Sequence, residues 1–467
     1  MSRLVVVSNR TPGKGPAAGG LAVALRKTLA EREGFWFGWS GKLVEQPSPT
    51  ARVEDIEGLQ VAQIDLTRPD HQAYYSGFSN SILWPSFHLR LDLATLDGSW
   101  YEGYRRVSTQ FARSLLPLLK RDDVIWVHDY HLIPLASELR RLGARNRIGF
   151  YLHIPFPPAD TLYAIPNHLD LMRDLSRYDL IGMQARRDVT AFAEFAEHQA
   201  PSNISGHTLQ SVDFSRTEVE AFPIGSDPDA FARLTTSSSG KKMLQRMRKH
   251  LKEQRLIIGV DRLDYSKGLP QRVEAYEKLL SNDPRFRRQV HYLQIAPPSR
   301  DTIKEYQDIN DALDAICGRV MGRFAELDWQ PLTYLKRAYG QASLAGLYRL
   351  ARVGLVTPLR DGMNLVAHEY VGSQDPDDPG VLVLSRFAGA AEIFDAALLV
   401  NPFDTDETAE ALRLALDMPL DERISRWQSL MGAARTHNVD DWARSFLERL
   451  APPTRTATAT RDVLYVA

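Results

Sequence analysis

Two series of short apolar runs, separated by longer amphipathic segments, limit the folds that this chain can adopt. In the first half, the runs cover residues 3–9, 123–129, 147–154, 180–184 and 220–225. In the second half, they cover residues 255–263, 289–296, 352–359 and 380–385. Such runs are typical of parallel strands covered on both faces, and the segments between them, such as 19–33 and 101–120, supply the covering helices. The sequence therefore predicts an α/β protein built on parallel sheets.

The two series predict two doubly wound domains that face each other. We place the first domain at residues 1–232 and the second at 243–438, which suits a chain of 467 residues. The Ser- and Thr-rich stretch 235–242 is predicted to be the linker. The polar segment 199–218 predicts a loop or a hairpin, and residues 439–450 predict a last helix that could pack on either domain.

The balance of charge argues against a nucleic-acid partner. The chain carries 57 basic and 58 acidic residues, whereas nucleic-acid-binding domains are usually basic. No stretch reaches the roughly 18 apolar residues of a membrane span, and the apolar run Leu4–Val7 is too short for a signal peptide. The single cysteine, Cys317, cannot form an internal disulfide or a cysteine-based zinc site. We therefore expect a cytoplasmic protein with no membrane partner.

Polar side chains follow the strands of both series. In chain order they are Ser8, Asn9, Arg10, His128, Asp129, His153, Gln184, Arg262, Lys267, Ser299, Arg300 and Asp361. Ligands of open parallel sheets bind outside the carboxyl ends of the strands, so we expect these residues to line a cleft between the domains. The alternative is that loops are polar simply because they are solvated.

The stretch "GLVTPLRDGMNLVAHEYVG" (354–372) predicts a phosphate site. An apolar strand ends in a loop in which Gly362 permits tight geometry, and Asn364 is a good N-cap for the next helix. The helix N-terminus would favour a pyrophosphate. Its free amides would be those of Asn364, Leu365 and Val366. Glu369, one turn further, would accept hydrogen bonds from sugar hydroxyls; alternatively, it is a solvated helix residue.

Two cations follow the strand at 255–263. Arg262 and Lys267 lie on one short loop, and Pro270 suits the first turn of the next helix. Guanidinium and ammonium groups together would stabilise a negatively charged leaving group. The alternative is a surface pairing with Asp261 or Asp264.

Glycines and aromatic residues give weaker signals. Gly19 and Gly20 could let helix amides approach a phosphate, or could form a flexible turn. Aromatic residues in segments 34–41, 74–88 and 128–131 could line a sugar site, although such residues are more often core. His128, Asp129 and His131 are too few and too closely spaced to predict a metal site, so we assign none.

A set of motifs runs in order through residues 3–450. They are "SNR", "AGGLAVAL", "FGWSG", "YYSGFSNSILWPSFH", "VHDYHL", "LHIPFP", "DRLDYSKGLPQR", "APPSR", "TPLRDGMNLVAHEYV" and "GVLVLSRFAGAA". Together they resemble glycosyltransferase family 20, the retaining glycosyltransferases that include the bacterial trehalose-6-phosphate synthases. The resemblance implies a two-domain GT-B fold. It also implies the trehalose-biosynthetic transfer of glucose from UDP-glucose to glucose 6-phosphate, which yields α,α-trehalose 6-phosphate and UDP.

The resemblance assigns roles to matching residues in both domains. In the first domain, the acceptor-binding residues would be Arg10, Trp39, Tyr75, Trp84 and Asp129, joined by Arg300 from the second. The donor-binding residues would be Gly20, Arg262, Lys267, Gly362, Met363, Asn364, Leu365, Val366 and Glu369. The residues around the reacting atoms would be Arg262, Lys267, Asp361, His153 and Asp129. Departures include Asp261, where relatives often have Glu, and the loop 11–18.

The resemblance also implies a mechanism and an assembly. Glucose would be transferred by front-face substitution through an oxocarbenium-like state, with the departing phosphate accepting the proton of the incoming hydroxyl. Because Arg262 and Lys267 would stabilise that phosphate, no metal or other cofactor is expected. A homo-oligomer, dimer or tetramer, is implied, and residues 439–450 could return to the first domain.

Three alternatives stay open at this point. One is a sister glycosyltransferase with another phosphorylated acceptor, such as a glucosylglycerol-phosphate synthase. Another is a regulatory module that senses sugar phosphates without turnover. A nicotinamide-dependent oxidoreductase is disfavoured because no GxGxxG follows the first strand. The sequence does not choose among UDP, GDP and ADP donors.

Overall fold

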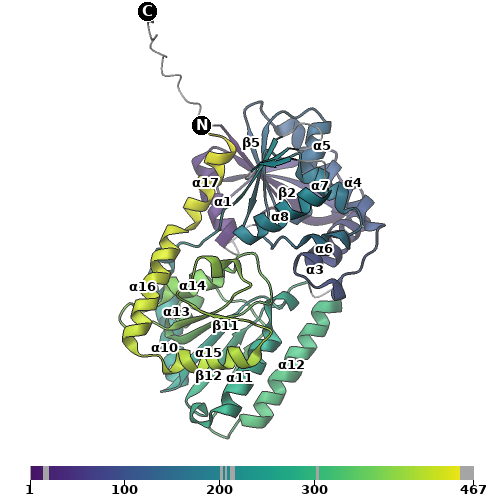
Figure 1. Cartoon of the computed structure of the whole chain (residues 1–467). Coiled ribbons are helices and arrows are strands. Elements are labelled where there is room, and N and C mark those ends of the chain that lie inside the picture. Colours follow the sequence, from purple (N-terminus) through teal and green to yellow (C-terminus); the bar gives the residue numbers. More distant parts are fainter. Residues whose placement is uncertain are drawn as a thin grey trace, which may run out of the picture.

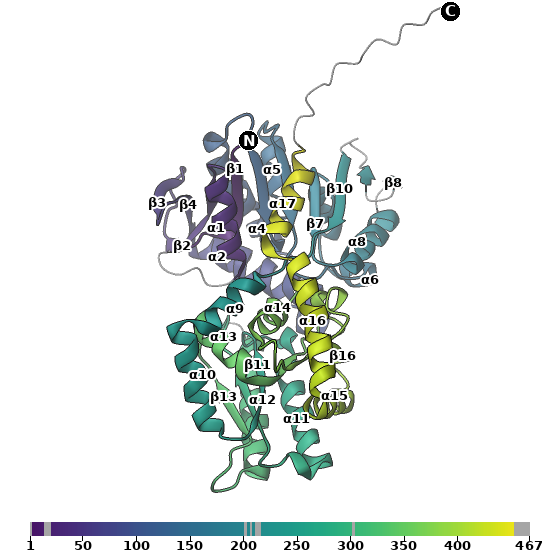
Figure 2. The same cartoon turned by 90° about the vertical axis from the view of Figure 1, so that its left-hand side faces the viewer.

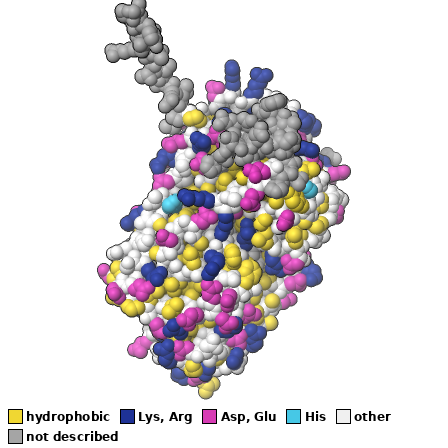
Figure 3. All heavy atoms as spheres, viewed as in Figure 1, with side chains coloured by type: hydrophobic (Ala, Val, Ile, Leu, Met, Phe, Trp, Pro, Cys, Tyr) yellow, Lys and Arg dark blue, Asp and Glu magenta, His cyan; other side chains and the backbone are white. Residues whose placement is uncertain are grey.

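The computed structural model describes residues 2–13, 20–199, 203–205, 208–210, 216–300 and 304–452. Two sheets dominate it, one above the other in Figure 1, and each has helices on both faces. Within the described residues, no helix is both long and apolar enough to cross a membrane. On the face shown in Figure 3, acidic and basic side chains are interspersed over the described surface.

The upper sheet, sheet A, has ten strands. In order across the sheet they are β3 (Arg52–Ile56), β4 (Leu59–Thr67), β2 (Phe35–Val44), β1 (Leu4–Arg10), β5 (Val124–His128), β6 (Arg147–Tyr151), β7 (Leu180–Met183), β10 (Arg216–Ala221), β9 (Thr208–Gln210) and β8 (Asn203–Ser205). The pairings from β4 through to β10 are parallel, whereas β3, β9 and β8 pair antiparallel at the two edges.

The lower sheet, sheet B, is parallel throughout its six strands. In order they are β13 (Leu332–Leu335), β12 (Val290–Ile295), β11 (Arg255–Val260), β14 (Ala351–Val356), β15 (Val381–Ser385) and β16 (Leu398–Val400). The central strands of both sheets are almost completely buried, as continuous apolar runs require. The prediction of parallel α/β sheets is confirmed.

Helices fill the connections. Those around sheet A are α1 (Gly20–Glu31), α2 (Arg68–His71), the π-helix η1 (Gln72–Leu83), α3 (Trp84–Phe87), η2 (Leu91–Leu93), α4 (Trp100–Leu115), η3 (Leu116–Leu118), η4 (Tyr130–Leu132), α5 (Leu135–Arg141), α6 (Ala159–Tyr163), α7 (His168–Leu175) and α8 (Arg186–Gln199). Those that follow are α9 (Pro228–Thr236), α10 (Ser238–Leu251), η5 (Tyr265–Lys267), α11 (Leu269–Asn282), η6 (Pro284–Phe286), α12 (Lys304–Phe324), α13 (Gln341–Leu350), α14 (Leu365–Ser373), η7 (Gly389–Glu392), α15 (Thr405–Asp417), α16 (Leu420–Thr436) and α17 (Val439–Leu450).

The prediction that residues 235–242 form an irregular linker is wrong. Helix α9 ends at Thr236 and α10 begins at Ser238, with Ser237 as N-cap between them. The Ser237 hydroxyl accepts a hydrogen bond from the amide of Gly240 at 3.1 Å. A Ser-rich stretch suits helix capping as well as a linker, and here capping prevails. The hairpin alternative for residues 199–218 is confirmed by the described strands β8 and β9.

The chain returns to sheet A at its end. Helices α16 and α17 form an arm along one side of the molecule, α16 beside sheet B and α17 beside sheet A (Figures 1 and 2). Trp442 and Phe446 of α17 pack on Trp126 of β5, with ring centres 4.8 Å and 4.7 Å away. This contact ties the last helix to the first sheet by apolar burial.

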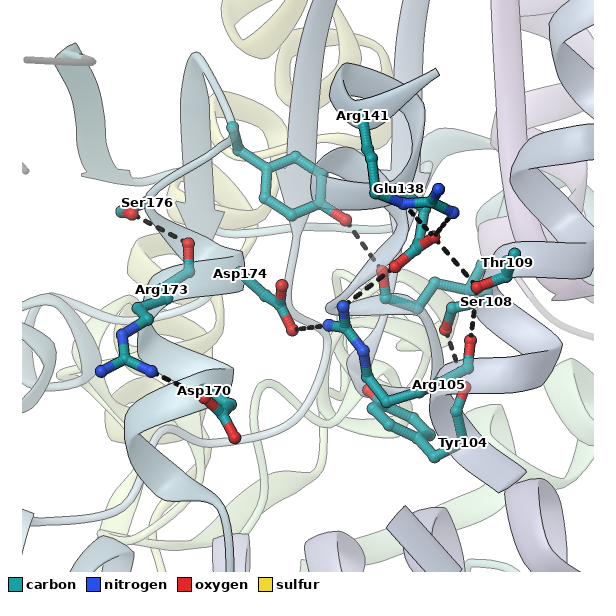
Figure 4. A network of polar contacts seen from close by, with 12 residues as sticks. Tyr104, Arg105, Ser108, Thr109, Glu138, Arg141, Asp170, Arg173, Asp174 and Ser176 are labelled. Atoms are coloured by element: carbon teal, nitrogen blue, oxygen red, sulfur yellow. Dashed lines mark hydrogen bonds and ion pairs between the residues drawn. The ribbon is translucent and has the colours of Figure 1, made fainter. Parts of the chain in front are cut away.

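Three helices on the outside of sheet A are joined by one arginine (Figure 4). Arg105 of α4 donates to Asp174 of α7 at 2.5 Å and to Glu138 of α5 at 2.9 Å. Both carboxylate side chains are only 6% exposed. Arg141 also pairs with Glu138, at 2.6 Å. Burial raises the pKa of Asp174 even though Arg105 opposes the shift.

Removal of Arg105 should destabilise the protein. In Arg105→Ala, Asp174 loses its cation and Glu138 one of two, so two nearly buried carboxylates are undercompensated, which we expect to lower the free energy of unfolding by about 3 kcal/mol. Denaturant-induced unfolding measures the change. Arg173→Ala is the matched control, because its pair with Asp170 is 74% and 43% exposed and should contribute under about 1 kcal/mol. Equal losses in the two variants would contradict the assignment.

Candidate functional site

The two sheets meet at the carboxyl ends of their strands, a region that we call the inter-sheet junction. Arg300, which follows β12, lies over the ring of Trp84 at 3.9 Å and donates to the Tyr130 hydroxyl at 3.2 Å. Arg360, which follows β14, donates to the carbonyl of Phe156 at 2.9 Å. Segments that follow strands of sheet B therefore contact residues of the sheet A half at this junction.

The two sheet halves approach each other so closely at the junction that only glycine fits at position 362. A Cβ added there would lie 2.1 Å from the carbonyl oxygen of His153, which is too close for any other residue. The backbone angle φ of Gly362 is not positive, so the reason for glycine is the approach of the other chain segment rather than turn geometry. The loop after β14 is thereby pressed against the end of β6.

Connected ion pairs and hydrogen bonds between charged and amide side chains support the loop after β14. Lys267 pairs with Asp361 and lies 3.9 Å from Asp261. Asn364 donates to Asp361 at 3.1 Å and to Asp261 at 3.3 Å. Arg272, fully buried, donates to Asp261 at 2.7 Å. Buried Asp261 thus links Arg272 to the loop, a role that sequence reasoning missed because Arg272 lies inside a helix rather than at a strand end.

Helix α14 begins where the sequence predicted. Asn364 is its N-cap and has a positive φ of 80°. The Asn364 side chain accepts the amide of Val366 at 3.2 Å, so that amide is not free, contrary to expectation. The amides of Asn364 and Leu365 have no acceptor within the described residues. Two first-turn amides, rather than three, are therefore available to an anion.

Glu369 is partly buried rather than solvated. Burial raises its pKa to about 7, with a further contribution from Asp261, while a hydrogen bond from the Tyr348 hydroxyl at 3.4 Å opposes the shift. The carboxyl group therefore changes charge near neutral pH. Tyr348 is a second residue that no sequence signal indicated.

Arg262 is exposed and, within the described part of the chain, makes no hydrogen bond or ion pair. The alternative of a pair with Asp261 or Asp264 is therefore not found for Arg262, whereas Lys267 does lie 3.9 Å from Asp261. The charge of Arg262 still reaches across the junction, because it lowers the pKa of both Asp129 and Asp264. An unpaired cation at such a place can bind an anionic ligand without first breaking an ion pair.

Asp129 has a strained backbone. Its φ of 76° and ψ of 162° fall in a region that is almost confined to glycine. Its carboxylate accepts the His153 amide at 3.2 Å, and its own amide donates to the carbonyl of Tyr151 at 2.8 Å. Burial raises the pKa of Asp129 to about 6, although the backbone amides of His153 and Tyr130 and the charges of Arg300 and Arg262 oppose the shift.

Arg300 is held by residues from both sheets. Tyr306 accepts one of its hydrogen bonds, and Asp264 lies 3.8 Å away. Burial lowers the pKa of Arg300, but Tyr130, Tyr306, Asp264 and Tyr75 together raise it above the ordinary value. The guanidinium is therefore fixed in its charged form at the junction.

A group of aromatic rings adjoins this cation. Tyr75, on the π-helix η1, stacks on His131 at 5.7 Å and lies 6.3 Å from Trp39. Arg10 lies 5.8 Å from the Trp39 ring. The π-helix, a rare form often found at functional sites, was not predicted, and it turns Tyr75 toward these residues.

The remaining predicted residues are placed as follows. Gly20 is the first residue of α1, and Gly19 lies outside the described residues. Met363 is buried, and His153 is partly exposed. Among the described residues, no three His, Cys, Asp or Glu side chains lie close enough together to hold a metal ion.

Similarity to known proteins extends over nearly the whole chain. Glycosyltransferase family 20 matches residues 8–452. A trehalose-6-phosphate synthase of Sinorhizobium fredii is 49% identical over 457 residues, which are 96% of this chain and 98% of that protein. An α,α-trehalose-phosphate synthase (UDP-forming) from Burkholderia xenovorans, solved in complex with glucose-6-phosphate, has a TM-score of 0.92 at 49% identity and covers 96% of this chain and 100% of its own. An E. coli structure bound with UDP-2-fluoro glucose has a TM-score of 0.91 at 44% identity, with coverage of 96% and 99%.

Relief of the strain at Asp129 should be measurable. In Asp129→Gly, the buried carboxylate is lost and the positive φ no longer causes steric strain, because glycine has no Cβ. In Asp129→Ala, only the carboxylate is lost and the strain remains. We expect the glycine variant to be more stable than the alanine variant by about 1 kcal/mol in denaturant-induced unfolding. If the two variants unfold at the same denaturant concentration, the backbone at residue 129 is not strained.

Proposed function

The chain belongs to glycosyltransferase family 20, and from that premise we propose that it transfers glucose from UDP-glucose to glucose 6-phosphate. The products are α,α-trehalose 6-phosphate and UDP. One observation carries the proposal: Arg262 and Arg300 of the sheet B half face Asp129 and Trp84 of the sheet A half across the junction. This arrangement provides cations for two phosphorylated ligands and a carboxylate for a sugar. The GT-B fold, two parallel-sheet halves in contact, supplies the frame.

The acceptor binds on the sheet A side. Arg300, with Arg10 and Tyr75, holds the phosphate of glucose 6-phosphate, and Trp84 and Trp39 contribute the walls. Asp129 accepts hydrogen bonds from sugar hydroxyls. The support is that Arg300 is kept charged beside Trp84 and that Tyr75 lies within electrostatic range of it. The relative solved with glucose-6-phosphate is 49% identical to this chain.

The donor binds on the sheet B side. The free amides at the start of α14 approach its pyrophosphate, and Gly20 at the start of α1 contacts a donor phosphate. Leu365 and Val366 form the first turn there, and Glu369 accepts the ribose hydroxyls. His153, Asp361 and the backbone of Gly362, Met363 and Asn364 hold the donor glucose. The relative bound with UDP-2-fluoro glucose supports UDP as the nucleotide.

Charge on the leaving phosphate decides the rate of the chemical step. The bond from the glucose anomeric carbon to the β-phosphate oxygen breaks, and a bond to the acceptor hydroxyl oxygen forms on the same face. The hydroxyl proton passes to the departing β-phosphate. Arg262, which has no ion-pair partner among the described residues, and Lys267, which Asp361 positions, stabilise the charge that grows there. These two cations supply that stabilisation in our scheme, so it includes no metal.

Two further statements belong to the same proposal. We propose a cytoplasmic location, consistent with a single cysteine, Cys317, that is buried. We also propose a homo-oligomer. Size-exclusion chromatography with light scattering measures the second directly, and a monomer at micromolar concentration would overturn it.

The reaction is tested by UDP release. The protein is given UDP-glucose with glucose 6-phosphate, with glycerol 3-phosphate, or with no acceptor. Release only with glucose 6-phosphate, accompanied by a non-reducing phosphorylated disaccharide, supports the proposal. Release with glycerol 3-phosphate instead would indicate a sister transferase. Binding of UDP-glucose without release under any condition would indicate a regulatory module.

Loss of Arg262 should slow turnover more than it weakens donor binding. Arg262→Ala removes a charge that interacts most strongly with the departing phosphate, so we expect kcat to fall by about 10²–10³-fold. Arg337→Ala serves as control, since it removes an exposed arginine that donates a hydrogen bond to the Tyr339 hydroxyl. An unchanged kcat with a raised KM for UDP-glucose would mean that Arg262 binds substrate and transition state equally.

Donor affinity should depend on the charge of Glu369. Because the Glu369 pKa is about 7, its carboxylate is present above that pH and is lost as the pH falls through it. We expect the Kd for UDP-glucose to rise as the pH is lowered from 8 to 6, measured by calorimetry. The pyrophosphate of UDP-glucose does not titrate in this range. Glu369→Gln should remove the dependence; a dependence that survives in this variant belongs to another group.

A further inference from the structure

The ring of His153 contacts a second histidine that has no assigned role. His128, the last residue of β5, is 1% exposed, and its Nδ1 lies 3.0 Å from Nε2 of His153. The two rings stack with centres 5.3 Å apart and planes inclined by 22°. Behind His128 lie the indoles of Trp126 at 4.7 Å and Trp442 at 6.3 Å. His128 therefore sits between an apolar wall and a residue of the junction.

One proton must be shared between the two facing nitrogens. Burial lowers the pKa of His128 well below its ordinary value and that of His153 to about 3, so both rings are neutral at physiological pH. A neutral imidazole has one N–H and one lone pair. Either Nδ1–H of His128 donates to Nε2 of His153, or Nε2–H of His153 donates to Nδ1 of His128.

The surroundings of Nε2 of His128, the ring nitrogen that faces away from His153, decide between these two arrangements. This nitrogen is buried without a hydrogen-bond partner in the described part of the chain. The second arrangement places an N–H there, and a buried donor without an acceptor is rare and unfavourable. The rings of Trp126 and Trp442 adjoin His128, indole can only donate, and the Trp126 nitrogen is itself buried without an acceptor among the described residues. A lone pair at Nε2 of His128 suits this donor-rich wall, so the first arrangement is favoured.

We propose that His128 is a positioning residue, which donates from Nδ1 to Nε2 of His153 and thereby holds His153 in its Nδ1–H form. Nδ1 of His153 has no partner among the described residues and is not buried, so its N–H is open to a ligand. It presents a neutral donor to an oxygen atom in the junction. Only the identity of that oxygen, a hydroxyl of the donor sugar, rests on the proposed function.

The backbone of His153 is held from the same direction. Its amide donates to Asp129, the residue after His128, and its carbonyl lies against Gly362. The end of β5 therefore orients both the main chain and the ring of His153. This role needs only neutral rings, so the donor is present at physiological pH.

The tautomer can be measured directly by long-range ¹H–¹⁵N spectra of the full chain labelled with ¹⁵N-histidine, with His153→Gln used to assign the signal. We expect His153 to carry its proton on Nδ1 in the absence of any substrate. A proton on Nε2 of His153 overturns the proposal. Because no substrate is present, this result is independent of the proposed reaction.

Two variants of His128 separate positioning from packing. Asparagine keeps an N–H close to the position of Nδ1, whereas leucine fills the space without a donor. In His128→Leu, we expect the proton of His153 no longer to be confined to Nδ1 and kcat/KM for UDP-glucose to fall roughly tenfold. In His128→Asn, we expect the proton to stay on Nδ1 of His153 and kcat/KM to stay within about threefold of the wild-type value. His291→Leu, another buried histidine, lies away from the junction and should change neither.

The outcomes distinguish the alternatives. If His128→Leu and His128→Asn lose activity equally while the His153 spectrum stays unchanged, His128 is a packing residue and the proposal is wrong. If the leucine variant fails to fold, the wild-type spectrum and the asparagine variant still decide. If no nucleotide sugar is turned over by the wild type but the Nδ1–H form is found, the proposed function fails and the positioning role stands.

Discussion

The contact between Gly362 and the carbonyl of His153 sets how near the two sheets come, and the rest of the junction depends on that spacing. With a side chain at position 362, the loop after β14 could not reach the end of β6. Asp361, the neighbour of Gly362, and its partner Lys267 would then lie further from the end of β6. One close backbone approach therefore brings together charges from strands more than 200 residues apart in the chain.

Within this junction, the carboxylates divide into two groups by their partners. Asp261 and Asp264 each have a cationic partner: Arg272 donates to Asp261, and Arg300 lies 3.8 Å from Asp264. Asp129 and Glu369 have no ion-pair partner in the described chain, and burial raises their pKa values to about 6 and about 7. The second group is the one expected to meet hydroxyl groups, because a desolvated carboxylate gains most from a hydrogen bond. Arg262, an exposed cation without a partner in the part of the chain that the structure describes, is the complement expected for a phosphate.

Several features of the site could be predicted from the sequence because they depend on local order. Polar residues after apolar strands had to lie at a sheet edge, and Asn364 had to begin a helix. Other features could not be predicted. Arg272 and Tyr348 lie on helices and act through distant partners, and the π-helix that carries Tyr75 has no known sequence signal. The Ser-rich stretch near Ser237 was misassigned because serine suits caps and linkers alike. The edge strands β3, β13 and β16 are short, and β3 and β13 lack the continuous apolar runs of the central strands.

The sequence by itself determined the parallel sheets, the helix N-terminus at Asn364 and the residues at the strand ends, since each follows from periodicity or from a residue's own backbone preference. Its motifs, taken as a set, also determined the family. The tertiary structure alone decided which of these groups are paired, buried or strained. Lys267 is held by Asp361 while Arg262 has no partner within the described ranges, Asp129 has a backbone angle that only its neighbours can enforce, and His128 faces His153. The physical reason is that solvation and pairing energies depend on distances between segments far apart in the chain, which no local pattern records.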